Sequence, residues 1–260
     1  MRVPILMYHE VTPRPAPAYR RYTVTPEELG LQLDWLRERG YTTVRMDDVH
    51  AAWRGERVLP RRAVVITFDD GGRDCLEHAV PALVARGFTA TFYVVAGVIG
   101  GPMRWLRAEI GLELPAADWP ALRAAEAAGM RCEAHSVSHP RLATVSADVC
   151  RQELVRGRTL LEDGLGREVR HLAYPFGSSS RETREIAREA GYLTACTTAE
   201  ALATPADDLL ALPRVPVVGT EGMREFRHRV RRARPIGLID AGLRSVARRL
   251  GLAHRPNSSG

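Results

Sequence analysis

The chain has 260 residues, a length at which an α/β barrel commonly forms one large domain with its own core. The apolar fraction of 45% and the charged fraction of 26% are ordinary for a globular protein, and no apolar run is long enough to cross a membrane. The net charge of +6 comes entirely from arginine, because the sequence contains no lysine, and it favours anionic partners only weakly.

The cysteines and the first residues indicate a reducing compartment. The four cysteines lie far apart and form no CxxC pair, which excludes a disulfide scaffold. The run from Val3 to Tyr8 already has the pattern of a core strand, and no basic and apolar leader with a cleavage site precedes it. We therefore expect a cytoplasmic protein whose thiols are free and buried.

Seven short apolar runs are predicted to be strands, since they are too continuous for a sheet with one face in water. The runs are Ile5–Tyr8, Val64–Thr67, Thr91–Val95, Met130–Ala134, His171–Tyr174, Leu193–Cys196 and Arg214–Val218. Helix signals lie between them. Thr25 to Glu28 form a capping box with a proline at the first helical position, and Gly40 ends that helix. Ser179 and Glu182 repeat the signal. This alternation predicts parallel strands wrapped by helices, as a (β/α) barrel or a doubly wound sheet.

Two segments stand apart from this alternation. Residues 97–120 are the longest irregular connection, and we expect them to lie over a functional site. From about residue 221 to residue 260 the chain becomes an arginine-rich tail with an apolar stripe. This tail predicts either a helix packed on the barrel with a solvated basic face, or a helix attracted to an anionic membrane surface. The stripe consists of Ile236, Leu238, Ile239, Leu243, Val246 and Leu250.

A pair of adjacent carboxylates is the strongest feature of the sequence. Asp69 and Asp70 end a predicted strand and are followed by Gly71 and Gly72. Strand alternation aims neighbouring side chains in different directions, so that one carboxylate can bind a cation while the other acts as a base. The alternative is an Asx-type turn that closes the strand.

Two histidines four residues apart follow another predicted strand. His135 and His139 can converge on one cation from a helix turn or a tight loop, and with one carboxylate they leave a coordination position open for water. Cys132 is a competing ligand, although its place within the strand favours the core.

These polar residues share a place in the predicted fold. His9 follows the first strand, and Tyr174 and Phe176 lie where another strand ends in a turn. A (β/α) barrel assembles its active site from the carboxyl ends of its strands, so we expect all of them at one face.

The residues from Thr67 to Gly71 (Thr-Phe-Asp-Asp-Gly), followed by His135-Ser-Val-Ser-His139, closely resemble the polysaccharide deacetylase family, which is carbohydrate esterase family 4 or the NodB homology domain. The resemblance covers roughly residues 1–220. It implies a distorted (β/α) barrel of about seven strands with outer helices, which removes the N-acetyl group of an amino sugar by metal-assisted hydrolysis. It also implies Asp69 as the general base and Asp70, His135 and His139 as ligands of one divalent transition metal ion, zinc first, with cobalt or nickel as alternatives.

The sequence departs from the family pattern in two places. The arginine that usually orients the base is replaced by Ala173, and we expect Arg214 to supply the guanidinium from a later strand. We also expect its replacement by Ala to lower activity without unfolding the protein. The usual Leu-x-His motif is absent, but the start of the chain resembles the circularly permuted poly-N-acetylglucosamine deacetylase branch, which makes His9 the candidate general acid. A backbone N–H near Phe176, in the turn after Tyr174, is the candidate oxyanion donor.

The expected partner is an acetylated amino sugar in a polysaccharide, an oligosaccharide or a lipid-linked sugar, with peripheral contact to an anionic membrane through the tail. Trp105, in the connection at residues 97–120, is either a core residue or one that stacks on the sugar. One rival is a catalytically impaired carbohydrate-binding module of the same fold. The other is a nucleic-acid-binding protein, which the basic charge suggests but no recognised motif supports.

Overall fold

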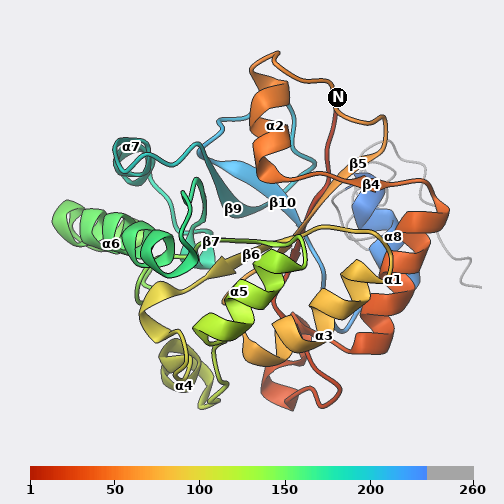
Figure 1. Cartoon of the computed structure of the whole chain (residues 1–260), viewed down its shortest axis with the longest axis horizontal. Coiled ribbons are helices and arrows are strands. Elements are labelled where there is room, and N and C mark those ends of the chain that lie inside the picture. Colours follow the sequence, from red (N-terminus) through yellow and green to blue (C-terminus); the bar gives the residue numbers. More distant parts are fainter. Residues whose placement is uncertain (233–260) are drawn as a thin grey trace, which may run out of the picture.

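Seven parallel strands close into a barrel in the computed structural model, which describes residues 1–232 (Figure 1). The strand order is β1-β10-β9-β8-β7-β6-β5, and β5 pairs again with β1 through Ile5 and Val65, which closes the ring. The predicted barrel of about seven strands with outer helices is thereby confirmed. The strands are β1 (Ile5–Tyr8), β5 (Ala63–Phe68), β6 (Thr91–Val94), β7 (Arg131–Ala134), β8 (His171–Ala173), β9 (Thr194–Glu200) and β10 (Leu212–Pro216).

Strand alternation divides the apolar side chains into two layers. Val64, Ile66 and Phe68 face outward and pack under the helices in the main core. Val65 faces the barrel interior and belongs to a second cluster that also holds Ile5, Tyr93, Ala173, Cys196 and Leu212. The same alternation turns Thr67 and Asp69 inward, toward the carboxyl end of the barrel.

Helices cover the outside of the barrel (Figure 1). They are α1 (Pro26–Glu38), α2 (Met46–Trp53), α3 (Arg73–Val84), α4 (Arg104–Ile110), α5 (Trp119–Ala127), α6 (Ala147–Leu165), α7 (Arg181–Glu189) and α8 (Met223–Arg232). Helix α1 begins with the predicted capping box: Glu28 N–H donates to Thr25 Oγ1 at 3.1 Å, and Thr25 N–H donates to the Glu28 carboxylate at 2.7 Å. Short strands β2 (Glu10–Val11) and β3 (Thr23–Val24) pair beside the barrel, and β4 (Thr42–Thr43) joins β5.

Two local predictions are corrected. The connection at residues 97–120 is not irregular throughout, because it contains helix α4. Helix α7 is capped by Ser180, whose hydroxyl accepts from Thr183 N–H at 3.1 Å, and not by Ser179, because the chain enters the helix one residue later than the motif suggested.

Helix α8, at the start of the arginine-rich tail, packs against the barrel's outer layer. Phe226 is buried, and its ring meets the edge of Trp35 on α1 at 5.9 Å between centroids. The apolar stripe predicted for residues 236–250 lies outside the described residues. Within residues 1–232, no helix is both long enough and apolar enough to cross a membrane.

Candidate active site and metal centre

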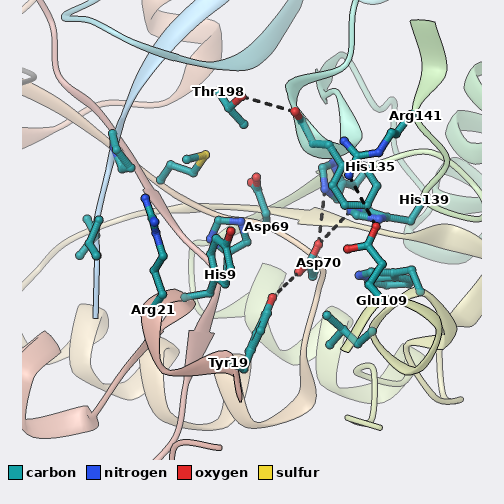
Figure 2. Close-up of a pocket in the computed structure, with 18 of the residues that line it drawn as sticks. His9, Tyr19, Arg21, Asp69, Asp70, Glu109, His135, His139, Arg141 and Thr198 are labelled. Carbon is teal, nitrogen blue, oxygen red and sulfur yellow. Dashed lines mark hydrogen bonds and ion pairs between the residues drawn. The ribbon is translucent and has the colours of Figure 1, made fainter. Parts of the chain in front are cut away.

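A pocket of about 470 Å³ opens at the carboxyl end of the barrel (Figure 2). Its floor holds the two neighbouring carboxylates Asp69 and Asp70, and side chains from several loops form its walls. Six of the eight predicted site residues are brought together here. The pocket lining includes His9, Asp69, Asp70, His135, His139 and Phe176, while Arg214 lies directly behind Asp69.

Three side chains meet at one point of this pocket and could hold a metal ion. Asp70 Oδ1 lies 3.5 Å from His135 Nε2 and 3.3 Å from His139 Nε2. One ligand atom from each residue lies within 4.8 Å of the other two, and all three residues are buried. Charged and polar groups are rarely buried together unless they are paired or coordinate an ion.

The chemistry of these three donors fits a divalent transition metal. The Nδ1 atom of His135 lies 2.7 Å from the carbonyl oxygen of Ala173, which fixes the proton on Nδ1 and leaves the Nε2 lone pair facing Asp70. Two imidazoles and one carboxylate with further positions open are the ligand set of catalytic zinc sites. Cys132 is excluded from the group because its thiol is buried beside the carbonyl oxygen of Leu122, in the core.

A tight loop, and not a helix turn, brings the two histidines together. Ser136 and His139 both have positive φ, and the Ser136 hydroxyl accepts from His139 N–H at 3.0 Å. Glu153 on α6 holds the outside of the loop, accepting from the backbone N–H groups of Val137 and Ser138 at 2.8 Å each. Gly157, one turn further along α6, lets this helix approach, since an added Cβ would lie 3.0 Å from the Ser136 backbone.

Backbone strain in the described residues is concentrated at this site. The residues other than glycine with positive φ are Asp70, Ser136, His139 and Phe176, and all four lie in or beside the pocket. Such conformations cost on the order of 1–3 kcal/mol each and persist only where the surrounding structure holds them. The left-handed backbone of Asp70 and His139 therefore lowers the stability of the fold, and it sets the directions of these two candidate metal ligands.

Asp69 and Arg214 form a buried pair directly beside the candidate metal ligands Asp70, His135 and His139. The guanidinium donates two parallel hydrogen bonds of 2.6 Å to the Asp69 carboxylate, and its remaining N–H groups reach Thr197 O at 2.9 Å and Thr67 Oγ1 at 3.2 Å. Burial alone would raise the pKa of Asp69, but the charge of Arg214 outweighs it and holds the pKa below its usual value. Asp69 is therefore ionised and oriented, and it still faces the pocket.

His9 follows β1 and lines the pocket beside Asp69, on the side away from His135 and His139 (Figure 2). Its Nδ1 is buried without a hydrogen-bond partner among residues 1–232, and its ring meets Tyr22 edge-on at 5.2 Å. Burial lowers the pKa of His9, and the negative charges of Asp69 and Asp70 oppose that effect without reversing it.

The turn after β8 contributes only one of its two predicted residues. Phe176 lines the pocket, and its ring meets His139 edge-on at 4.5 Å. Tyr174 does not reach the pocket: its hydroxyl donates to Leu210 O at 3.0 Å within the outer core, and its backbone N–H donates to Cys196 O. Strand alternation at the end of β8 directs this ring outward, so Tyr174 is corrected to a structural residue.

Further residues line the pocket, and of these the sequence had singled out only Trp105. Tyr19 donates to Asp70, and Trp105 stacks on His139 with ring centroids 4.4 Å apart, which covers one face of the indole. Arg141 and Glu109 lie 3.7 Å apart at the rim. No local motif marks Tyr19, Glu109 or Arg141, because each lies on a segment between the barrel strands whose path depends on the rest of the fold.

The chain is similar to known proteins in both sequence and fold. The polysaccharide deacetylase family pattern matches residues 56–195, more than half of the chain. YxkH of Bacillus subtilis (strain 168) is 24% identical over 216 residues, which is 83% of this chain and 71% of YxkH. The poly-beta-1,6-N-acetyl-D-glucosamine N-deacetylase of Escherichia coli (strain K12) is 36% identical over 83 residues, which is 32% of this chain but only 12% of that protein.

The structure of the Streptococcus pyogenes deacetylase PplD in complex with acetate superposes with a TM-score of 0.77 at 25% identity, covering 90% of this chain and 99% of that one. Fold and sequence pattern thus lead to the same assignment, which the motifs around Asp69 and His135 had predicted. The chain belongs to the polysaccharide deacetylase family.

Proposed function

We propose that this enzyme is a metal-dependent hydrolase that removes the N-acetyl group from an amino-sugar-containing substrate. One observation carries the proposal: an ionised, oriented carboxylate, Asp69, lies in one pocket with a cluster of Asp70, His135 and His139. A binding module would gain nothing from a base held beside a metal cluster, so the arrangement favours catalysis over binding alone.

Asp70, His135 and His139 would hold the metal ion, with zinc as the first candidate and cobalt or nickel as alternatives. When bound, such an ion lowers the pKa of a water molecule and polarises the acetyl carbonyl. The chain contributes a preorganised setting, because the three side chains are almost fully buried and two of them are fixed by left-handed backbone.

Asp69 would accept the proton of the attacking water as the oxygen–carbon bond forms. Both of its oxygens bind Arg214, yet a carboxylate has further lone pairs, and one of them remains for the water. Arg214 keeps Asp69 ionised and restricts its rotation, while a backbone N–H near Phe176 is the candidate donor to the developing oxyanion.

His9 would donate the proton that the departing amine nitrogen needs when the carbon–nitrogen bond breaks. Its lowered pKa makes the protonated ring a stronger acid, at the expense of the fraction that is protonated before reaction. The His9 ring therefore has to gain its proton before the carbon–nitrogen bond breaks. The products of the reaction are the free amine and acetate.

The substrate class rests on the relatives. The matched segment of the Escherichia coli protein belongs to an enzyme named for poly-beta-1,6-N-acetyl-D-glucosamine, and the PplD structure holds acetate, the product of deacetylation. We therefore place N-acetylglucosamine polymers first, ahead of lipid-linked and other acetylated amino sugars.

Acetate release tests the proposal. Purified protein is stripped with a chelator, supplied with zinc, cobalt or nickel, and assayed on poly-N-acetylglucosamine oligomers, chitin oligomers, peptidoglycan fragments and a lipid-linked amino sugar. We expect activity that disappears with the metal and returns with it on at least one substrate class.

His139→Ala is expected to lose both the bound metal and the activity, because it removes one of three ligands. His78→Ala is the matched control, since His78 lies on the outer helix α3 away from the pocket. Full activity in chelator-treated protein, or metal bound equally well by His139→Ala, would contradict the proposed function.

A further inference from the structure

The two oxygens of the Asp70 carboxylate have different partners. Oδ1 faces the imidazoles of His135 and His139 at 3.5 and 3.3 Å, whereas Oδ2 accepts a hydrogen bond of 3.0 Å from the hydroxyl of Tyr19 (Figure 2). An ionised carboxylate can only accept, so the tyrosine hydroxyl is the donor.

Tyr19 reaches Asp70 from the short 3₁₀ helix Pro17–Tyr22, which lies 51 residues earlier in the chain. Its backbone is held on both sides: its N–H donates to Ala16 O, and its carbonyl accepts from the Thr23 hydroxyl, each at 2.9 Å. The ring is 6% exposed and packs in a small apolar cluster with Met103, Trp105 and Leu106, among others. The hydroxyl is thus presented to Asp70 from a rigid support.

The terminal torsion of an aspartate side chain is broad and roughly two-fold, so a carboxylate without a partner can turn and expose either oxygen. At Asp70 the backbone is already left-handed, with φ of 73°, and only the side-chain rotation is left to be fixed. A donor on Oδ2 stops this rotation and leaves Oδ1 toward the two histidines.

We propose that Tyr19 is a positioning residue for the metal centre: its hydroxyl holds Asp70 in the orientation that completes the metal site, so that metal affinity depends on it. This inference rests on the proposed function, because it assumes that Asp70, His135 and His139 bind the ion. Hydrogen-bonded partners of metal-ligating carboxylates typically change metal affinity by about 10–100-fold when they are removed.

The alternative is that the hydroxyl serves only to satisfy buried polar groups and adds general stability. Tyr192 provides the matched control, since it is also a buried tyrosine, with a hydroxyl that donates to Leu154 O at 2.9 Å. Neither Tyr192 nor Leu154 lines the pocket.

The experiment compares wild type, Tyr19→Phe and Tyr192→Phe as full-length chains. Metal-free protein is titrated with zinc in competition with a chromogenic chelator, cobalt binding is followed by its visible absorption spectrum, and the thermal unfolding of each metal-free protein is recorded. We expect Tyr19→Phe to weaken zinc binding about 10–100-fold and to alter the cobalt spectrum, while Tyr192→Phe binds like wild type.

Equal zinc affinity and equal cobalt spectra in wild type and Tyr19→Phe would overturn the inference, even if both tyrosine variants unfold at lower temperature. A wild-type protein that binds neither zinc nor cobalt would overturn the proposed metal centre itself, and this inference with it. The two failures are distinguished by the wild-type titration.

Discussion

The two ends of the barrel use the same residue types in different ways. At the amino end, Glu133 on β7 accepts from the backbone N–H groups of Arg170 and His171 at 2.9 Å each and from Arg167 at 3.1 Å. At the carboxyl end, Asp69 and Asp70 are equally buried, but they face an open pocket beside Nδ1 of His9, which has no hydrogen-bond partner among residues 1–232.

Burial and pairing therefore do not identify a functional site in this protein. The Glu133 carboxylate is satisfied by its donors on ordinary backbone, whereas left-handed residues other than glycine occur, within residues 1–232, only around the pocket. The carboxyl end differs from the amino end in its strained backbone, in the pocket beside it and in the polar atoms that face this pocket. Single substitutions at the two ends can test this contrast.

Among these substitutions, Asp69→Asn at the carboxyl end should have the largest effect on activity. We expect a loss of about 10²–10⁴-fold in kcat with metal content nearly unchanged, because the amide cannot take a proton from water while Asp70 stays in place. Glu133→Gln, an equally conservative change at the amino end, should alter stability but leave the kcat of the folded protein intact. Wild-type turnover by Asp69→Asn, measured as acetate release, would make Asp69 structural.

Arg214→Met is expected to lower the free energy of unfolding by about 3–5 kcal/mol, since it leaves a buried carboxylate without its partner. The sequence led us to expect that replacing Arg214 lowers activity without unfolding the protein, and the structure adds this loss of stability because the Arg214 side chain has no exposed surface. The pKa of Asp69 should also rise toward and beyond its usual value. The acid limb of kcat/KM then moves to higher pH.

Urea unfolding and pH–rate profiles measure the two effects of Arg214→Met. Arg167→Met is the control, because this arginine is also paired with acidic side chains, Glu126 and Glu133, but at the amino end. It should lower stability and leave the acid limb in place. If the acid limb of Arg214→Met does not move, Arg214 does not tune Asp69.

Glu10→Gln tests a carboxyl just behind the site. Burial, then the charges of Asp74 and Asp70, raise the pKa of Glu10 to about 8, and its Oε1 has no partner among the described residues. Since the folded state then binds a proton that the unfolded state has released, wild-type stability should fall as pH rises from about 4.5 to 8.

In metal-free wild type we expect the ionisation of Glu10 to lower the free energy of unfolding by roughly 1–3 kcal/mol over this pH range, given that a tenfold change in proton affinity corresponds to about 1.4 kcal/mol. Glu10→Gln should lack this part of the fall. Unfolding in urea at pH 6 and pH 9, with chelator present, measures it. Identical pH dependence in wild type and Glu10→Gln would show that Glu10 is ionised in the folded protein at neutral pH.

Asp47→Asn at the amino end should have the smallest effect. Its hydrogen bond with His171 lowers the pKa of Asp47 to about 2, so the pair stabilises the fold above pH 3.8 and loses that contribution as pH falls toward 2. Because the Asp47 side chain is 44% exposed, we expect less than about 1 kcal/mol at pH 7. If thermal unfolding shows that Asp47→Asn loses several kcal/mol of stability, the pair of Asp47 and His171 contributes substantially to the stability of the barrel.

The amino-acid sequence by itself determined the seven strands and the positions of Asp69, Asp70, His135 and His139 at strand ends. Continuous apolar runs and the residues that follow them are local signals, and parallel strands bring their carboxyl ends to one face whatever the details of packing. The family assignment rested on the same local motifs.

Only the tertiary structure decided how these residues are held. Arg214 meets Asp69 across 145 residues of sequence because barrel closure brings β10 and β5 to either side of β1. Tyr19 and Glu153 reach the site from a short 3₁₀ helix and from α6, which carry no motif for the site. Glu153 holds the loop in which His139 has its left-handed backbone. Tyr174 was placed wrongly because a turn residue can face the pocket or the core, and only the register at the end of β8 chooses between them.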